Sequence, residues 1–125
     1  MKIYTSYYGN LRNLEEENII PICISQTVPK YLKGMAYCDK LAPNRDMHER
    51  GYSWDEFRLR VLTPLDQQLI FMELEDLGKG KDIALCCYEK DPLTCHRHLV
   101  GEWLSLKSGV PVQEWVKEDP QPLLF

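Results

Sequence analysis

The apolar positions of the chain change period several times, and each change marks an expected element. Four short apolar stretches are rich in β-branched or aromatic residues, as strands are. In 64–77 and 93–108 the apolar residues recur at three- and four-residue spacings, as amphipathic helices require. The four expected strands are residues 2–8, 19–25, 82–88 and 110–115. Strands that alternate with helices predict an α/β fold, a single Rossmann-like three-layer domain with a mainly parallel sheet of about four strands and helices on both faces.

Helix-capping residues and prolines set the expected boundaries. Ser53 begins a capping box that predicts a helix over 54–62. Pro64 suits the first position of the next helix, which should end at Gly78. Pro21 lies inside an expected strand, so that strand either starts at or beyond Pro21 or lies at a sheet edge.

The remaining segments have no clear period. Residues 11–17 are expected to form a short polar helix after the first strand. Residues 30–52 read mostly as a long loop with a helical turn near 30–34, and loops of this length are usually functional or mobile. The tail 117–125 is expected to be loosely attached to a single domain that covers 1–125.

Composition and charge narrow the class of protein. A hydrophobic content of 44% excludes a disordered chain, and no apolar stretch approaches the ~20 residues that cross a bilayer. The net charge of −4 argues against nonspecific binding to a nucleic-acid backbone, although residues 30–60 carry seven Lys/Arg against five Asp/Glu. Five cysteines without a leader sequence predict free thiols in a reducing cytoplasm.

Reactive side chains concentrate at one strand-to-helix turn, the run CYEKDPLTCHR at 87–97. Cys95, His96 and Arg97 are expected in the first turn of the helix, capped either by Asp91 or by Thr94. Unpaired N–H groups and the helix dipole favour an anion there, such as a phosphate, a carboxylate or a thiolate. A cysteine in this position beside cationic side chains can act as a nucleophile.

Four interpretations of this turn remain open. In the structural one, Arg97 pairs with Glu89 or Asp91 and the cysteines are buried packing residues. In the second, Arg97 and His96 help to bind an anionic substrate, with Glu89 as general acid or base and Cys95 as nucleophile or pocket wall. The third is a metal site, and the fourth is a redox disulfide between Cys87 and Cys95. We expect neither a metal nor a cofactor.

In parallel sheets, ligands bind beyond the carboxyl ends of the strands, so other segments should join this turn. Ser25 and Gln26 lie at the end of the second strand, and Cys87 and Glu89 lie at the end of the third. At the end of the first strand, four residues supply the hydroxyls and amides that a phosphate or ribose site uses, although a turn and helix cap explain them too. These expected substrate-binding residues are Thr5, Ser6, Tyr7 and Asn10.

The loop 30–52 interleaves tyrosines with lysines and arginines. Aromatic platforms with cations suit a nucleotide or a single nucleic-acid strand, but a solvated loop whose tyrosines pack on the sheet fits equally well. His48 reads as a surface residue, because nothing in the sequence fixes a partner for it.

The run CYEKDPLTCHR followed by HLVGEWL resembles the signature of the domain-of-unknown-function 488 family, in which a strand ends in Cys-x-Glu and a Cys-His-Arg triplet opens the next helix. The opening KIYTSYYGNL and the later KLAP are also similar to that family, especially to its short bacterial and phage-type members. The resemblance singles out Cys87, Glu89, Cys95, His96 and Arg97 and implies no particular reaction.

These observations predict a cytoplasmic protein that binds a small phosphorylated or nucleotide-like ligand at the 87–97 turn and acts on it, with hydrolase-type chemistry from Glu89, Cys95 and Cys87. A noncatalytic module that binds nucleotides or proteins at the same turn is the alternative. A nucleic acid is a further candidate partner, and no membrane is expected.

Overall fold

The computed structural model describes residues 1–32 and 34–117, and within them the chain forms a five-stranded sheet in the order β3-β2-β4-β1-β5. Every neighbouring pair of strands is parallel, which confirms the α/β class. The strands are β1 (Ile3–Tyr7), β2 (Ile20–Cys23), β3 (Ala36–Tyr37), β4 (Ile83–Cys87) and β5 (Val112–Glu114).

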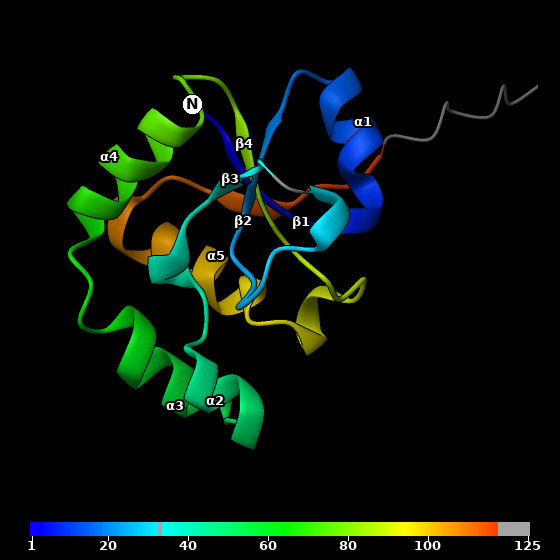
Figure 1. Ribbon diagram of the computed structural model, residues 1–125. Helices are drawn as coiled ribbons and strands as arrows, with labels where there is room; N and C mark the ends of the chain where they lie inside the picture. Colours follow the sequence, from blue (N-terminus) through cyan, green and yellow to red (C-terminus); the bar gives the residue numbers. More distant parts are fainter. Residues whose placement is uncertain (33, 118–125) are drawn as a thin grey trace, which may run out of the picture.

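Helices cover both faces of this sheet. Figure 1 shows α1 on one side of the strands and α4 on the other, as right-handed crossovers in opposite directions along the sheet require. The helices are α1 (Leu11–Glu16), α2 (Arg45–Arg50), α3 (Trp54–Phe57) with a π-helical continuation (Arg58–Leu62), α4 (Gln67–Leu77) and α5 (Arg97–Ser108).

The core has two parts, one on each face of the sheet, because successive side chains of a strand point to opposite faces. In β4, which is buried along its whole length, Ile83 and Leu85 pack with α4 and α5, while Ala84 and Cys86 pack on the α1 side. β4 is therefore the central strand, and the 87–97 turn that follows it is attached to a rigid part of the fold.

The expected long loop is more structured than its sequence predicts. Residues 30–52 contain the two-residue strand β3, the helix α2 and two 3-10 turns at Lys30–Leu32 and Asp39–Leu41.

The shortness of β3 explains why β2 tolerates Pro21, which lies within that strand and not at its start. β3 pairs only with Ile22 and Cys23, so the missing N–H of Pro21 faces a stretch that no strand covers.

Two expected helix starts are wrong by a few residues. The helix expected from Pro64 begins at Gln67, because Asp66 caps it by accepting from the Leu69 N–H at 3.2 Å. The last helix begins at Arg97 rather than near residue 93, although its end is confirmed by Gly109, which adopts the left-handed conformation at φ 72°. The Ser53 cap is confirmed, since its hydroxyl accepts from the Glu56 N–H at 3.1 Å.

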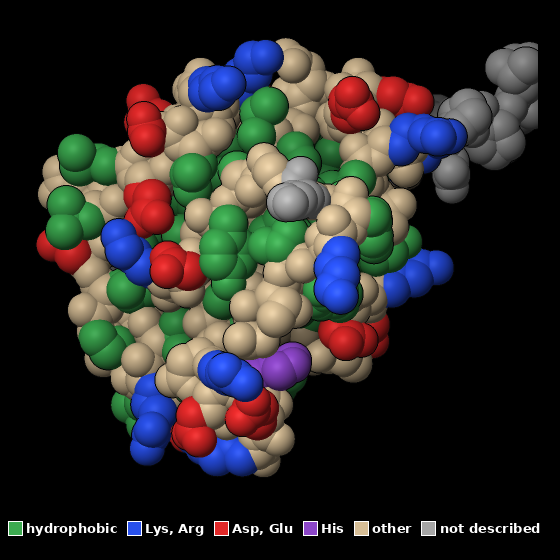
Figure 2. Space-filling view, in the orientation of Figure 1, with side chains coloured by type: hydrophobic (Ala, Val, Ile, Leu, Met, Phe, Trp, Pro, Cys, Tyr) green, Lys and Arg blue, Asp and Glu red, His purple; other side chains and the backbone are tan. Residues whose placement is uncertain are grey.

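The surface in Figure 2 shows basic and acidic side chains interspersed, without a large basic patch on that face. Among the helices of residues 1–32 and 34–117, none is both long and apolar enough to span a bilayer. The tail expected to be loosely attached falls outside the described residues beyond residue 117.

Candidate functional site

A cavity of about 130 Å³ lies at the carboxyl ends of β2 and β4. This position follows from the topology, because the neighbouring strands β2 and β4 lead to opposite edges of the sheet, β2 to β3 and β4 through α5 to β5. Its wall combines the segment after β2, the 87–96 turn and residues around α2. The lining residues are Ser25, Gln26, Thr27, Pro43, His48, Tyr52, Cys87, Tyr88, Glu89, Thr94, Cys95 and His96.

The two cysteines of the turn line this cavity and are joined by a disulfide. Cys87 is the last residue of β4, and Cys95 lies in extended conformation just before α5. Each sulfur also has a hydrogen-bond donor: the Arg97 backbone N–H lies 3.5 Å from Cys95 Sγ, and Arg97 Nη1 lies 3.2 Å from Cys87 Sγ. The structure thus pairs two of the cysteines that the sequence predicts to be free thiols.

The other three cysteines are free and buried, away from the cavity lining. Burial raises the pKa of the thiols of Cys23 and Cys86, and it raises the pKa of Cys38 to about 12. These thiols are packing residues of the core. The chemistry of sulfur in this protein is therefore confined to Cys87 and Cys95.

His96 is buried beside the sulfur pair, and its ring is oriented by the backbone. Nε2 lies 2.6 Å from the Ile24 carbonyl, so Nε2 carries the proton and donates it to that oxygen. Nδ1 then presents a lone pair toward Cys95 Sγ at 3.8 Å. Burial, reinforced by the positive charge of Arg97, lowers the pKa of His96 to about 4, so the ring is neutral at pH 7.

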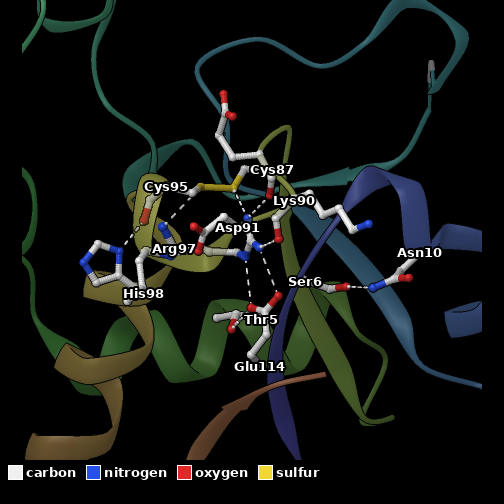
Figure 3. Close-up of polar contacts among 12 residues, drawn as sticks. Thr5, Ser6, Asn10, Cys87, Lys90, Asp91, Cys95, Arg97, His98 and Glu114 are labelled. Carbon is white, nitrogen blue, oxygen red and sulfur yellow. Dashed lines mark hydrogen bonds and ion pairs between the residues drawn. A yellow bond between two sulfur atoms is a disulfide. The ribbon is translucent and has the colours of Figure 1, made fainter. Parts of the chain in front are cut away.

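Arg97 is completely buried, and its guanidinium is saturated with partners inside the protein. Nε and Nη2 each donate at 3.0 Å to one oxygen of the Glu114 carboxylate. Nη1 contacts Cys87 Sγ and donates to the Glu89 carbonyl, and Nη2 donates to the Lys90 carbonyl at 2.9 Å. Figure 3 shows these contacts converging on one side chain.

The saturated guanidinium corrects two expectations. Arg97 has five N–H donors, and all five are used, so it is not the residue that holds an anionic ligand. Its carboxylate partner is Glu114, not Glu89 or Asp91, which the sequence suggested. Arg97 instead positions the loop that carries Glu89, whose own side chain is exposed at the cavity.

The start of the turn is fixed by a local cap. Asp91 Oδ1 accepts from the Leu93 N–H at 2.9 Å, with Pro92 in the first position of a 3-10 turn, so Asp91 caps this turn. The N-cap of α5 is His96, so that helix is capped by neither Asp91 nor Thr94, the two residues that the sequence suggested. After this turn the chain is extended at Cys95 before α5 begins. The interruption directs Cys95 into the cavity instead of leaving it in the first turn of the helix.

Residues 3–108 match the family model described as the Active DUF488-N3 subclade, DUF488-N3a. The chain belongs to this family. No curated protein and no solved structure matches the chain. The expected resemblance is thus confirmed at the level of the family.

The DUF488-N3a match covers the whole signature, Cys87 to Arg97, but ends before β5. Glu114, the carboxylate that neutralises Arg97, therefore lies outside the matched residues. The sequence analysis missed Glu114, although one signal was present in the strand VPVQEW. Glu114 is two residues after Val112, so both side chains point to the face of the strand that packs on α5. A carboxylate on an apolar strand face needs a buried cationic partner.

The substrate-binding residues expected at the end of β1 do not line the cavity in this DUF488-N3a protein. Thr5 donates to Glu114 Oε1 at 2.7 Å, and Ser6 accepts from the Asn10 amide at 3.0 Å. The physical reason is strand order, because β1 lies between β4 and β5 while the cavity opens on the opposite side of β4, toward β2. Tyr7 likewise lies outside the lining.

Other expected residues reach the cavity from the 30–52 segment and its end. His48 is exposed, as expected, and lies in the lining with the half-buried Tyr52. Tyr37 supports the wall from behind, since its hydroxyl donates to the Ser25 carbonyl at 2.9 Å. Tyr31 is exposed and away from the lining.

The set Cys87, Cys95 and His96 has the composition of a zinc site, with its ligand atoms within 4.8 Å of one another. A metal binds thiolates, whereas the two sulfurs here are bonded to each other. The set is therefore in a form that does not bind a metal.

Proposed function

We propose that this protein is an enzyme that binds a nucleotide-like substrate in the cavity and acts on it with hydrolase-type chemistry, using Cys95 as the nucleophile. The observation that carries this proposal is the environment of Cys95 Sγ. A lone pair of neutral His96 faces it at 3.8 Å, and the Arg97 N–H at the start of α5 points to it at 3.5 Å. After reduction of the disulfide, the His96 lone pair suits the Cys95 thiol, whose proton it can accept as the sulfur attacks, and the Arg97 N–H suits the negative charge on that sulfur.

The lining supports a base or sugar, rather than a phosphate, as the part of the substrate inside the cavity. Aromatic rings come from Tyr52 and Tyr88, and hydroxyl and amide groups come from Ser25, Gln26 and Thr27. Rings for stacking, combined with a few polar groups, suit a nucleoside. Among the described lining residues there is no Lys or Arg, so a phosphate would lie outside the cavity, toward solvent.

The proposed reaction has two steps. The Cys95 thiolate attacks an electrophilic carbon of the substrate, the bond to the leaving group breaks, and the leaving group takes a proton from water. Glu89, exposed at the cavity, then removes a proton from the water that hydrolyses the thio-linked intermediate and frees Cys95. A reducing cytoplasm suits this chemistry because it keeps Cys95 reduced. The description of the family as an active subclade also favours an enzyme.

The test is to incubate the reduced protein with a panel of nucleosides, nucleotides and short single-stranded oligonucleotides. Release of a product is followed by liquid chromatography, and mass spectrometry detects any adduct on Cys95. Wild type should turn over at least one class, Cys95→Ser should bind it without turnover, and Glu89→Gln should accumulate the adduct. Cys86→Ala is the matched control, because Cys86 neighbours Cys87 in β4 but packs on the other face of the sheet.

Two results would decide against catalysis by Cys95. Turnover that survives in Cys95→Ser would remove the nucleophile from the mechanism. Binding by the wild type without any product or adduct would instead assign the cavity to a noncatalytic nucleotide-binding module.

A further inference from the structure

The disulfide and the surroundings of its two sulfurs carry an inference about control of this site, which rests on the proposed nucleophilic role of Cys95. We propose that Cys87 and Cys95 form a reversible thiol–disulfide pair that reacts with hydroperoxide. Cys95 is the sulfur that attacks the oxidant, and Cys87 is the resolving cysteine that closes the disulfide.

Access favours this pair over the other cysteines. Both sulfurs lie on the wall of the cavity, although the two side chains are buried. A small oxidant can therefore reach them, whereas a thiol carried by another protein is too large to enter. Cys86 is the next residue to Cys87 but packs among the residues of the α1 face. A hydroperoxide that enters the cavity therefore meets only two of the five thiols of the chain.

The donors around the sulfurs favour the reduced state. Arg97 Nη1 at 3.2 Å from Cys87 Sγ and the Arg97 N–H at 3.5 Å from Cys95 Sγ stabilise thiolates more than they stabilise a disulfide. In thiol–disulfide proteins, stabilisation of the reduced form makes the disulfide easier to reduce. The pair is therefore suited to cycling and is unlike a structural disulfide.

The loop that carries both cysteines keeps its shape without the disulfide. Arg97 donates to the carbonyls of Glu89 and Lys90, and Asp91 caps the following turn. Because these contacts do not involve sulfur, opening the disulfide leaves Cys87 and Cys95 facing each other. The reaction can run in both directions in the folded protein.

The direction of attack follows from His96. Its Nδ1 lone pair faces Cys95 and not Cys87, so it can accept the hydrogen bond of the Cys95 thiol and take the thiol proton as that sulfur attacks. The Cys95 sulfur attacks one oxygen of hydrogen peroxide, the O–O bond breaks, and the departing hydroxide takes the proton that His96 has accepted and becomes water. The Cys87 thiolate then attacks the sulfenic sulfur of Cys95, the S–O bond breaks, and the disulfide forms; the departing hydroxide takes a proton from solvent and leaves as a second water.

Oxidation thus has a functional consequence. A sulfur in a disulfide cannot attack a substrate as a thiolate, so the oxidised protein is the inactive form of the proposed enzyme. A dithiol returns both sulfurs to thiols and restores the nucleophile.

The experiment counts thiols and uses no substrate, so its outcome is separate from that of the proposed function. The reduced protein is treated with hydrogen peroxide, denatured and labelled with a maleimide, and the number of labels is counted by mass spectrometry of the intact protein. The count should fall from five labels to three, the three free cysteines, and should return to five after a dithiol is added to the folded protein.

Variants assign the roles of the two sulfurs. Cys87→Ser should stop at a sulfenic acid on Cys95 that dimedone traps, while Cys95→Ser should consume peroxide about tenfold or more slowly, at the rate of an ordinary thiol. The control Cys86→Ala should fall from four labels to two. Equal peroxide rates in Cys87→Ser and Cys95→Ser, or a wild-type count that stays at five, would refute the proposal. A disulfide that opens only in denaturant would also refute it.

Discussion

Lowering the pH should destabilise this protein through His96. The ring is buried, with Nε2 donating to the Ile24 carbonyl, and burial with the nearby positive charge of Arg97 lowers its pKa from 6.5 to about 4. Between these two values the unfolded chain binds a proton that the folded protein excludes. The free energy of unfolding is therefore highest above pH 6.5 and falls as the pH is lowered toward 4.

The size of the effect follows from the pKa difference. A pKa that moves from 6.5 to about 4 corresponds to about 3 kcal/mol of stability, lost at a rate that approaches about 1.4 kcal/mol per pH unit in the middle of the interval. This is a large share of the 5–15 kcal/mol that is typical of a folded domain. An acid transition of this protein should therefore begin well above the range in which carboxylates titrate.

The assay is urea unfolding followed by circular dichroism at several pH values from 7.5 to 3.5, on wild type and on His96→Gln, with the disulfide intact in both. The variant loses the buried ring, so its stability should depend less on pH and the two curves should converge as the pH falls. His48→Gln is the matched control, because His48 is exposed and is only the smallest of the influences on the pKa of His96, so its replacement should change the slope much less than that of His96. Curves for wild type and His96→Gln that run parallel from pH 6.5 to 4 would refute the reasoning.

Three further substitutions test the contacts that hold the fold, by the same unfolding measurement. Arg97→Met should cost about 3–5 kcal/mol, because it leaves the Glu114 carboxylate without its buried partner, whereas the exposed Arg58→Met should change stability by less than about 1 kcal/mol. Asp91→Ala should cost about 1 kcal/mol, because the Leu93 N–H loses its cap. Gly78→Ala should cost about 1–3 kcal/mol, since a Cβ there meets the Ile83 side chain; a neutral result would show that the α4–β4 corner can adjust.

Much of the fold could be predicted from the sequence because most of its elements carry a strong local signal. The buried run of β4 and the Ser53 cap belong to this group. β3 gave no such signal, since two residues cannot establish a period of two. The start of α4 was misplaced because both Pro64 and Asp66 are acceptable helix starts, and only the folded backbone shows that Asp66 holds the cap.

For the site, the sequence identified the right turn but not its neighbours. Cys87, Glu89, Cys95 and His96 do line one cavity, whereas Thr5 and its neighbours do not. Motifs give the residues at the end of each strand, but the order of strands in the sheet decides which ends meet. Here β4 has β1 on one side and β2 on the other, and only the β2 side opens into the cavity.

Arg97 has the role that differs most from the expected one, since it holds the protein together at the site and does not bind a ligand. Its geometry explains why the family signature ends in an arginine. One planar group contacts the Glu114 carboxylate of β5, the Cys87 sulfur of β4 and two carbonyls of the loop, so it joins the sheet to the cavity wall through five donors. A lysine has three donors on a single nitrogen and could not reach all of these acceptors. Because the same side chain also stabilises the Cys87 thiolate, the shape of the loop and the reactivity of the sulfur pair depend on a single group. A substitution of Glu114, beyond the family match, should therefore affect both.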